Sequence, residues 1–554
     1  MMKLNKFFYL MLGVTAFAVT ACDDIDEQEP ESGTLTLEQV QLTNTDLPVR
    51  TEASFSAMFN FIGKARTGYP NSSRADDFGY IMAAISLDAE GADLFLQDNN
   101  YNWFSVAGEL SSRNANYANP AIRYKIPYTH IGMANDIIAG FPEDTTDPDA
   151  INKIAQARAV RAYAYMALAP YFQFGYATAA DQPCIPILRG GDDFDYSNNP
   201  RATVREVWEY IMEDLNFAVE HLAGAKRATK AQIDQNVAYG LRARANLITG
   251  NWAAAAADAA AAAQGYEPAS MAEVSVPAFC NLNEHNWIWG ADITDQMAQD
   301  NGYQTSSSWL SAFSGDGYAA ATQNTPQINT MLWKKIPATD VRKGWWIDEN
   351  LHSPNWANLT WVDAGAGTSA TGDEIATFVT SDDGKVELLP YTNIKFGQQS
   401  GVGNILNNND FPLMRVEEMI LIQAEGLAKS GNDAQAIQVL ENFVKTYRDP
   451  EYKVNGRGLS LADEIWFQRR VELWGEGFFT GDMKRLGKPL VRFHGAGTSN
   501  QPDAFQFNLE ANDGWLNMRF PQTEMNNNSA IVDNEGGSLP VAGQNPNLRD
   551  GVTD

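Results

Sequence analysis

Basic residues are scarce in this chain. Its 554 residues include 40 lysines and arginines against 69 aspartates and glutamates, which leaves a formal net charge of −29. Proteins that bind nucleic acid need basic patches to meet the phosphates, so this balance excludes that class of partner. An acidic body instead suits a protein that faces water and takes neutral ligands.

Histidine is also rare, and its spacing is not that of metal ligands. None of the five histidines stands in a His-x-x-x-His or His-Glu-x-x-His arrangement: His130, His221, His285, His352 and His494. This spacing argues against a zinc enzyme. The sequence also lacks a Gly-x-Ser-x-Gly elbow, a phosphate loop and a dinucleotide fingerprint. We therefore expect no catalytic residues, no metal and no cofactor.

Cysteine is nearly absent beyond the first residues of the chain. Apart from Cys22, only Cys184 and Cys280 are present. Two such residues can form one disulfide in an oxidising compartment, or they can remain as two buried thiols. The sequence leaves both alternatives open.

Long hydrophobic runs are missing except at the N-terminus. Lys3 and Lys6 precede an apolar run over residues 7–19, which is too short to span a bilayer. The small residues that follow end in Cys22 and resemble a bacterial lipobox, in which the thiol is acylated. An ordinary signal peptide with an incidental cysteine is the alternative. We predict a lipoprotein signal peptide over residues 1–21, lipidation of Cys22, and a flexible, acylated tether over residues 22–34.

The rest of the chain is organised around a helical stretch over residues 411–487. Apolar residues recur there at helical spacing: Val416, Met419, Ile420, Ala424 and Leu427. Gly431 then ends this helix, because glycine accepts the left-handed conformation without a steric penalty. A second amphipathic helix follows after a turn so short that the two must pack antiparallel. A third helix ends near Arg469.

The same layout occurs earlier in the chain. A helix over residues 234–248 ends in Thr249-Gly250-Asn251, and an alanine-rich helix over residues 252–264 returns. Paired helices in units of about 34 residues are the signature of tetratricopeptide-like stacking. Further helices are expected over residues 55–64, 80–87, 124–139, 151–174 and 203–222. The alanines predict close helix contacts, and we expect Trp252 to be buried with them.

The character of the sequence changes over residues 268–410. Helical periodicity fades there, and eight of the fourteen tryptophans lie between Trp287 and Trp361. We predict loops and short strands laid over the helices, with a strand at residues 284–289. The expected architecture is mostly α, one domain over residues 35–554, with a helical scaffold at about 35–267 and 411–487.

Several motifs resemble the SusD/RagB family. Arg415, Glu417 or Glu418, Leu421, Ala424 and Glu425 match its "R-L-x-E-x-x-L-x-x-A-E" helix, and residues 469–487 match "R-R-x-E-L-x-x-E-G-x-R-x-x-D-x-x-R-W-G". Phe479 and Leu486 depart from this pattern, at its usual Arg and Trp. Matches to other family motifs run from residue 158 to residue 546. The simplest interpretation of the charged residues in the second motif is a structural ion-pair network: Arg469, Glu472, Glu476, Asp482 and Arg485.

The resemblance implies a location and a partner. Members of this family are nutrient-binding lipoproteins of Bacteroidota outer membranes, and each sits as a lid on a TonB-dependent transporter, the SusC-like barrel. Acidic residues behind the lipidated cysteine, here residues 23–27, go in this family with export to the cell surface. In other bacteria an aspartate after the cysteine can signal retention at the inner membrane, so the surface location depends on the resemblance.

Aromatic side chains in polar, loop-like segments are the candidate ligand-binding residues. A sugar ring has an apolar face that stacks on flat aromatics and a rim of hydroxyls that bonds Asn, Asp, Gln and Arg. Such segments contain the residues that we expect to bind a glycan: Asn99, Tyr101, Asn102, Trp103, Tyr303, Trp309 and Trp356. Trp287 and Trp289 on a strand, and Trp333 on a helix, are assigned to the core instead.

Three functions remain open from the sequence. The first is a glycan-binding protein without chemistry, which we predict. The second is a helical scaffold that binds a protein or peptide, as tetratricopeptide-like folds often do. The third is a glycoside hydrolase, which needs only two carboxylates flanking a bond.

Overall fold

The computed structural model describes most of the chain from residue 37 onward. The described residues are 37–46, 48–69, 74, 76–98, 105–190, 194–300, 309, 313, 324–363, 368–377, 380–381, 384–385, 388–399, 408–534 and 536–554. Within these ranges, no helix is both long enough and apolar enough to cross a membrane.

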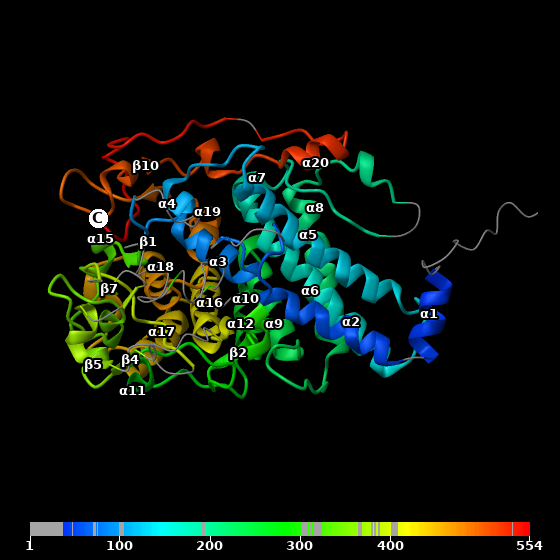
Figure 1. Cartoon of the computed structure of the whole chain (residues 1–554), viewed down its shortest axis with the longest axis horizontal. Coiled ribbons are helices and arrows are strands. Elements are labelled where there is room, and N and C mark those ends of the chain that lie inside the picture. The colour runs from blue at the N-terminus through cyan, green and yellow to red at the C-terminus, as the bar shows by residue number, and fades with distance from the viewer. Residues whose placement is uncertain are drawn as a thin grey trace, which may run out of the picture.

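A continuous row of antiparallel helices forms the scaffold (Figure 1). Each helix packs on the next in the row, in the order α5 (Ala118–Ala139), α6 (Pro148–Phe172), α8 (Val204–His221), α9 (Gln235–Thr249), α10 (Trp252–Ala262), α16 (Val416–Lys429) and α17 (Asp433–Tyr447). The two pairs that share the predicted layout, α9–α10 and α16–α17, stack directly on each other through α10 and α16. The mostly helical fold class with tetratricopeptide-like pairs is confirmed.

Short-range signals explain where these helices begin and end. Thr203 and Glu206 form a capping box at the start of α8, and the Asp234 side chain accepts a hydrogen bond from the backbone at the start of α9. Gly250 and Gly431, which follow α9 and α16, have φ values of 82° and 80°. Both turns of the repeat therefore use glycine in the left-handed conformation, as predicted.

Close approach of two backbones joins the stacked pairs. Gly426 on α16 faces the backbone of α10, where a Cβ atom would lie 2.5 Å from the Trp252 carbonyl oxygen. Buried alanines on α10, among them Ala255 and Ala259, leave room for this contact. The expectation that Trp252 is buried is wrong, because it is 39 % exposed. The backbone carbonyl group of Trp252 makes the close contact with α16, whereas its indole ring is partly exposed and lies near Lys429.

Additional helices surround this row. They are α1 (Leu37–Asp46), α2 (Pro48–Asn60), α3 (Gly79–Ala89), α4 (Ser105–Glu109), α7 (Tyr176–Ala179), α11 (Met271–Val274), α12 (Asp295–Asp300), α15 (Thr330–Trp333), α18 (Leu461–Glu472), α19 (Phe479–Leu486) and α20 (Gln522–Asn527). Short 3-10 helices add turns: η1 (Phe61–Gly63), η2 (Tyr196–Asn198), η3 (Val341–Trp345), η4 (Pro354–Trp356), η5 (Gly372–Thr377), η6 (Val454–Arg457), η7 (Asp503–Phe505) and η8 (Gly514–Leu516).

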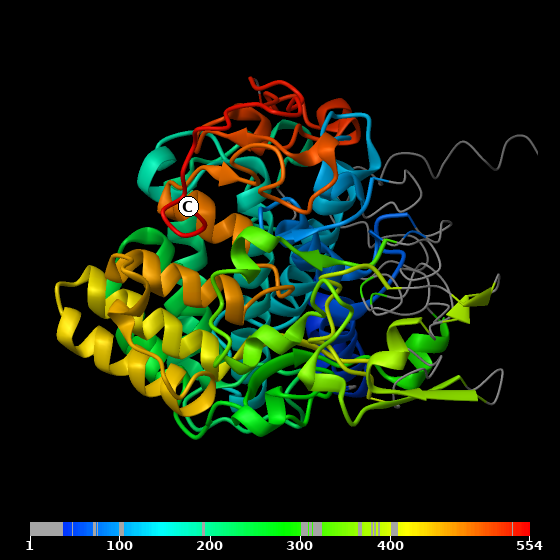
Figure 2. The same cartoon turned by 90° about the vertical axis from the view of Figure 1, so that its left-hand side faces the viewer.

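The strands are short and pair only in twos among the described residues. The antiparallel pairs are β1 (Leu94–Phe95) with β3 (Gln327–Ile328), β2 (Trp287–Ala291) with β8 (Phe411–Arg415), β4 (Thr360–Asp363) with β5 (Thr368–Thr371), β6 (Thr380–Ser381) with β7 (Gly384–Lys385), and β9 (Leu490–Val491) with β10 (Asn508–Leu509). Figure 2 shows the β4–β5 hairpin projecting beside the helices. The described residues of the range 268–410 therefore carry loops and small strands, as predicted, together with the short helices α11, α12 and α15.

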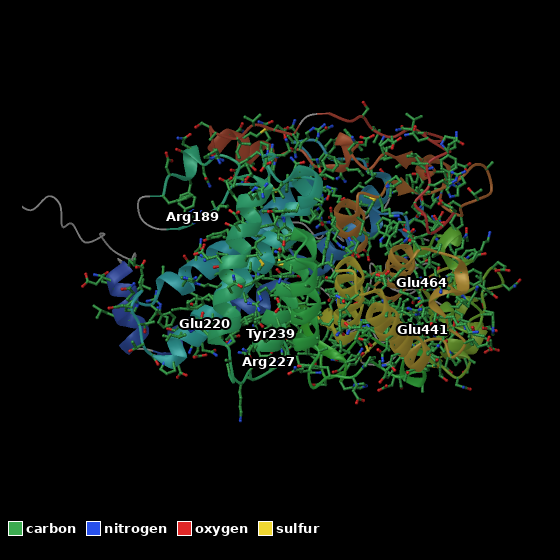
Figure 3. All side chains as sticks on the ribbon, turned by 180° about the vertical axis from the view of Figure 1, so that it is seen from behind. Arg189, Glu220, Arg227, Tyr239, Glu441 and Glu464 are labelled. Atoms are coloured by element: carbon green, nitrogen blue, oxygen red, sulfur yellow. The ribbon has the colours of Figure 1, made fainter. Side chains whose placement is uncertain are left out.

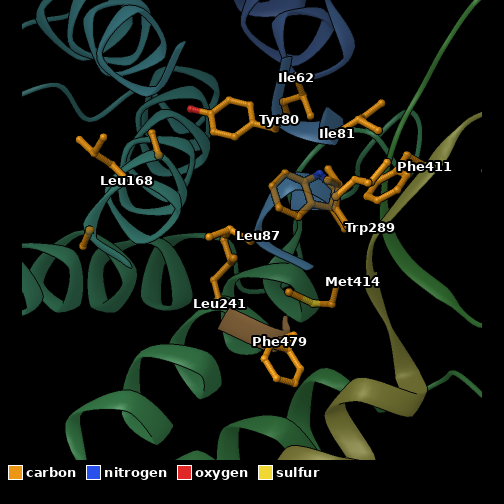
Figure 4. Close-up of a cluster of buried hydrophobic side chains, with 14 of the residues drawn as sticks. Ile62, Tyr80, Ile81, Leu87, Leu168, Leu241, Trp289, Phe411, Met414 and Phe479 are labelled. Atoms are coloured by element: carbon orange, nitrogen blue, oxygen red, sulfur yellow. The ribbon is translucent and has the colours of Figure 1, made fainter. Parts of the chain in front are cut away.

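The pairing of β2 with β8 explains two of the buried tryptophans. Residues 411–415, placed at the head of a helical stretch in the sequence analysis, form strand β8, and the helix begins at Val416. Trp287 and Trp289 on β2 are fully buried, which confirms their assignment to the core. This core also takes in Tyr80, Leu168 and Leu241 from three different helices (Figure 4).

Polar side chains cover the outer face of the helical row. Seen from behind in Figure 3, Glu220 on α8 and Tyr239 on α9 lie in one half of the molecule and Glu441 on α17 in the other. The C-terminal segment, red in Figure 1, runs along the top of the molecule in that view. There the Met518 backbone N–H donates to the carbonyl oxygen of Tyr171 on α6 (2.7 Å).

Buried ion pairs connect the loop-rich region to the helices. Arg415 pairs with Glu472 (3.1 Å) and with Glu476 (2.8 Å), and Lys395 donates to Glu476 (2.7 Å). Burial alone would raise the pKa of Glu472, but the neighbouring guanidinium groups, Arg448 foremost, hold it well below its usual value. Glu472 and Glu476 are therefore structural, as predicted.

The remaining motif charges form a second buried network. Asp482 accepts from Arg469 (2.7 Å) and from Arg485 (2.8 Å), and Arg485 also pairs with Glu425. Each carboxylate meets a guanidinium in direct hydrogen-bonded contact, which is what a buried charge requires. The prediction of a structural network is confirmed for these residues too.

Candidate functional site

Most of the predicted site residues lie outside the described residues. These are the lipidation site Cys22 and the candidate ligand-binding residues Asn99, Tyr101, Asn102, Trp103 and Tyr303. Their roles stay predictions. Trp309 and Trp356 are described, and the structure corrects what the sequence suggested for both.

Trp309 is a core residue. It is fully buried, and its indole Nε1 donates to the Asn409 carbonyl oxygen (2.9 Å). Its ring meets Phe396 and Phe411 edge to face, with centroids 6.0 and 5.3 Å away. A ring enclosed in this way has no free face for a sugar, so its predicted platform role is wrong. The residues next to Trp309 in the sequence are polar, and they gave no sign that its partners lie about a hundred positions further along the chain.

Trp356 is also buried. It is 2 % exposed and belongs to a small separate core with Ile347, Trp361 and Leu388. Its Nε1 donates to Asp373 (2.9 Å), and Asp373 also contacts His352 (2.8 Å). Trp356 is therefore a buried residue that holds Asp373 in place, and the prediction that its ring stacks on a glycan is wrong.

The structure joins two parts of the chain that lie near the predicted ligand-binding residues. Residues 99–103 follow β1 in the chain. In the β1–β3 ladder, Leu94 is opposite Ile328 and Phe95 is opposite Gln327. Just beyond it, the Gln97 backbone donates to the Asn324 side-chain oxygen (2.7 Å). The last described residues before the 99–103 segment therefore lie beside residues 324–328, although the two stretches are far apart in the sequence.

A third stretch lies beside these two parts of the chain. Thr392 forms a β-bridge with Gln327, and the Asn393 side chain donates to the Phe313 carbonyl oxygen (3.0 Å). Residues 388–399 therefore lie beside both β3 and the buried Phe313.

An open cleft is lined mainly by residues 333–355, which follow β3 in the chain, and we call it the Trp333 cleft. It encloses about 420 Å³, and its walls include Trp333, Lys343, Trp346, Asp348, His352 and Asn355. The Lys343 amine lies 4.3 Å from the Trp333 ring centroid and donates to the Ile336 carbonyl oxygen (2.7 Å). The cleft thus combines an aromatic ring with the amine of Lys343, the carboxylate of Asp348, the imidazole of His352 and the amide of Asn355. Such a combination suits a hydroxyl-rich ligand. Trp333 lies on α15 as predicted, but it is only half-buried, so the core assignment was incomplete.

Comparison with known families finds two related families that this chain is similar to. Residues 301–536 match the SusD family, and residues 82–247 match a second SusD-like family described as starch-binding and associating with the outer membrane. The two matches support a carbohydrate-binding protein that associates with the outer membrane. No curated protein matches this sequence.

Solved structures share the fold of this protein. A SusD-like carbohydrate binding protein from Bacteroides vulgatus is 22 % identical, with a TM-score of 0.67 over 87 % of this chain and 97 % of that one. A SusD superfamily protein from Bacteroides thetaiotaomicron is 18 % identical, with a TM-score of 0.67 over 88 % and 99 %. A SusD-like carbohydrate binding protein from Bacteroides fragilis is 14 % identical, with a TM-score of 0.60 over 88 % and 100 %. At these identities the likeness concerns the fold.

The departure at Phe479 from the usual SusD motif has a packing explanation. Phe479 is 7 % exposed and packs near Trp466, with ring centroids 6.3 Å apart. It presses so closely on Gly91 that a Cβ atom there would lie 2.2 Å from the ring. The Arg470 guanidinium lies over the Phe479 ring, with its Cζ atom 5.2 Å from the ring centroid. At the position where the motif usually has an arginine, Phe479 therefore makes a cation–π contact with Arg470.

Two buried carboxyl groups of this protein have pKa values near neutrality. Burial raises the pKa of Asp88 to about 7 and that of Asp410 to about 7. Asp88 accepts from the backbone of Gly477 (3.0 Å) and Phe479 (2.9 Å), and Asp410 accepts from two other backbone N–H groups. Neither lines the Trp333 cleft. Both therefore clamp chain segments together instead of facing a substrate.

The two described cysteines form no disulfide. Cys184 and Cys280 are free thiols, so the disulfide alternative is wrong, and burial raises the pKa of each to about 12. Among the described residues, no group of three or more His, Cys, Asp and Glu side chains is placed to hold a metal ion.

Proposed function

We propose that this protein captures oligosaccharides or polysaccharide at the cell surface and delivers them to a TonB-dependent outer-membrane transporter of the SusC-like type. It would be anchored by lipid on Cys22. The observation that carries this proposal is the match of residues 82–247 to a SusD-like family described as starch-binding and associating with the outer membrane. The sequence offers candidate groups for such a ligand in residues 99–103, which follow β1 in the chain, and in Tyr303. A glycan needs both stacking rings and amide groups at one place.

The first experiment is a glycan-array screen of the mature domain, followed by calorimetric titration with the best ligand. We expect saturable binding without turnover. We expect Tyr101→Ala and Trp103→Ala each to weaken binding about tenfold, which corresponds to the roughly 1–2 kcal/mol of one stacked ring, while the melting temperature stays unchanged. Unchanged affinity in both variants would exclude residues 99–103 as the binding site.

Trp309→Ala is the matched contrast within the same experiment. Because Trp309 is fully buried, its loss should destabilise the fold by about 3–5 kcal/mol. An Ala variant of Trp309 that melts like wild type but has lost the glycan would restore the platform role for this residue.

The Trp333 cleft is the alternative position for the ligand. Its wall residue His352 is exposed, whereas Asp348 is half-buried and accepts from the backbone N–H groups of Asn350 (2.8 Å) and His352 (2.9 Å). Asp348→Ala and His352→Ala are therefore each compared with wild type in a thermal melt before titration. We expect both variants to keep full glycan affinity. A tenfold loss in either variant, with unchanged affinity in the Tyr101 and Trp103 variants, would move the binding site to the cleft.

The transporter partnership has its own test. A tagged chain purified from detergent-solubilised membranes of its native host should bring a barrel of the SusC-like type with it. Recovery of the tagged chain alone would contradict this part of the proposal. Hydrolysis of the glycan during titration would favour a glycoside hydrolase, and binding of peptides but no glycan would favour a protein-binding scaffold.

A further inference from the structure

Two exposed aromatic rings flank the short helix α20, at the top of the molecule in Figure 1. Among the described residues, four large aromatic side chains are exposed: Tyr69, Tyr117, Tyr196 and Trp252. Tyr117 and Tyr196 are the most exposed of the four, at 49 % and 58 %. They belong to segments that are far apart in the sequence, yet both segments lie against the stretch that contains α20.

Backbone hydrogen bonds fix the two segments at opposite ends of α20. The Gln522 N–H, at the start of the helix, donates to the Ala115 carbonyl oxygen (2.9 Å), two residues before the first tyrosine. The Ser529 N–H, just beyond the end of the helix, donates to the Ser197 carbonyl oxygen (2.8 Å), directly after the second tyrosine. A helix of 6 residues is about 9 Å long. The two tyrosines are therefore placed to contact different units of one extended ligand.

The segment that carries Tyr196 is held firmly on the helix. The Asn199 N–H donates to the Asn528 side-chain oxygen (3.0 Å), and the Asn528 amide donates to the Asn199 carbonyl oxygen (2.7 Å). The Tyr196 ring also meets the Phe194 ring edge to face, with centroids 4.8 Å apart. An exposed ring on a backbone that is already fixed loses little freedom when a ligand stacks on it.

The surface around the two tyrosines is rich in amides and poor in charge. We call it the α20 face, and it consists of residues 114–118, 194–199 and 520–530. Eight of these 22 residues are Asn or Gln, and none is Lys or Arg. Both of its carboxylates already have partners, since Asp195 accepts from Ser197 (2.6 Å) and Glu524 accepts from Asn528 (2.9 Å). In a chain with a net charge of −29, this face therefore offers mainly uncharged hydrogen-bonding groups.

The exposed amides of α20 keep groups free for a ligand. Gln522 Nε2 donates to Asn526 Oδ1 (2.9 Å), and Asn527 Nδ2 donates to a backbone carbonyl oxygen (2.7 Å). The opposite atoms of the same amides, Gln522 Oε1, Asn526 Nδ2 and Asn527 Oδ1, have no hydrogen-bond partner in the part of the chain that the structure describes. A sugar hydroxyl both donates and accepts, so it can bond either kind of atom.

We propose that the α20 face is a second contact surface for a neutral glycan chain, on which separate sugar units stack on Tyr117 and Tyr196 and the hydroxyls between them bond the amides of α20. The inference rests on the proposed function and extends it from short glycans to polymers. Two contacts on one chain raise the affinity for a polysaccharide, whereas a short oligosaccharide occupies one contact at a time. Surfaces that bind proteins have an apolar core, but here amides separate the two rings.

The double variant Tyr117→Ala/Tyr196→Ala removes both rings. Because both side chains are exposed, we expect its melting temperature to equal that of wild type. Trp252→Ala is the matched control. Its ring is also exposed, at 39 %, but it lies on α10, which packs on α9 and α16.

The test compares long and short glycans on the whole mature chain. Native gels that contain amylopectin, arabinoxylan, galactomannan or mixed-linkage β-glucan measure the affinity for long chains. Calorimetric titration with maltotriose, xylotriose, mannotriose or cellotriose measures the affinity for the matching short chain. For the polysaccharide that retards wild type, we expect the double variant to bind at least tenfold more weakly. Its affinity for the matching trisaccharide should equal that of wild type, and Trp252→Ala should behave like wild type with both.

The other outcomes separate this inference from the proposed function. A double variant that is retarded as strongly as wild type would overturn the α20 face and leave the proposed function standing. Equal losses with the polysaccharide and the trisaccharide would also overturn it, because the two tyrosines would then belong to the first site. Unchanged glycan binding together with loss of the co-purified barrel would assign the face to a protein partner instead. Wild type that is retarded in none of the gels would contradict glycan capture itself, and this inference with it.

Discussion

Single buried charges decide much of the local structure. Glu425 and Asp482 each hold the Arg485 guanidinium, and Glu472 sits among Arg342, Arg415 and Arg448. Removing one partner of such a group leaves an uncompensated charge in an apolar setting, which destabilises far more than the loss of a surface ion pair. Two predictions at this scale concern a charge and a backbone conformation.

Glu425→Gln should change how stability depends on pH. Burial alone would raise the pKa of Glu425, but Arg485 outweighs it and lowers the pKa from 4.5 to about 2. A carboxyl group with a depressed pKa contributes stability above pH 4.5 and loses it as the pH falls toward 2, here about 3 kcal/mol in total. Between pH 6 and pH 3, urea unfolding should show wild type losing about 2 kcal/mol more than the variant. Parallel losses in the two proteins would contradict the coupling to Arg485.

Gly431→Val should destabilise the protein by about 1 kcal/mol or more. Gly431 has a φ of 80°, and a Cβ atom there meets nothing within 4 Å, so the loss comes from the backbone alone. A thermal melt measures it. Gly431→Asn is the control, because Asn tolerates the left-handed conformation and should lose less. Equal melting temperatures for Val and Gly at this position would contradict the explanation.

At the scale of elements, the contact between α10 and α16 joins the two repeated helix pairs into one row. Gly426 makes this possible, since its hydrogen is all that separates α16 from the α10 backbone. Helices that approach this closely depend on small residues at the crossing, and α10 supplies alanines there.

Gly426→Ala should therefore destabilise the protein by about 1–3 kcal/mol, in spite of alanine's higher helix propensity. The new Cβ would lie 2.5 Å from a carbonyl oxygen and 2.9 Å from a backbone nitrogen, and neither can move without shifting α10. Chemical unfolding gives the value. The control Gly132→Ala, with open space around it, should be equal to or more stable than wild type. Stabilisation by Gly426→Ala would show that the helices separate without cost.

At the scale of the whole molecule, the ion-pair network holds the loop-rich region on the helices. Lys395 from that region is buried and donates to Glu476 and to the Glu472 and Trp474 carbonyl oxygens. Residues 388–399 in turn lie beside β3. Residues 388–399 and β3 are therefore held on the helical scaffold by contacts that do not depend on any ligand.

Cys22→Ser should release the protein from the membrane or leave it unprocessed, because acyl chains on Cys22 are the only membrane contact that the sequence offers. Membrane fractionation of cells expressing the variant measures this. Cys280→Ser, which removes a free thiol elsewhere in the chain, is the control and should stay with the membrane. Tight membrane association of the Cys22 variant would contradict lipid anchoring at this residue.

The sequence by itself determined the helices, their caps and their turns. The signals for these features act over about four residues: Thr203 with Glu206, Asp234 with the start of α9, and glycine after α9 and α16. It also determined that the charges of residues 469–485 are structural. The family motifs, which are spaced patterns along the chain, were readable for the same reason.

Only the tertiary structure decided which aromatic rings are enclosed and which segments meet. Trp309 is buried by residues about a hundred positions away, and Gln97 meets Asn324 across 227 positions. Strand β8 likewise depends on β2, which is distant in sequence. Burial is a sum over such long-range neighbours, and local composition carries no record of them, so polar flanks around Trp309 and Trp356 predicted exposure where packing produced a core.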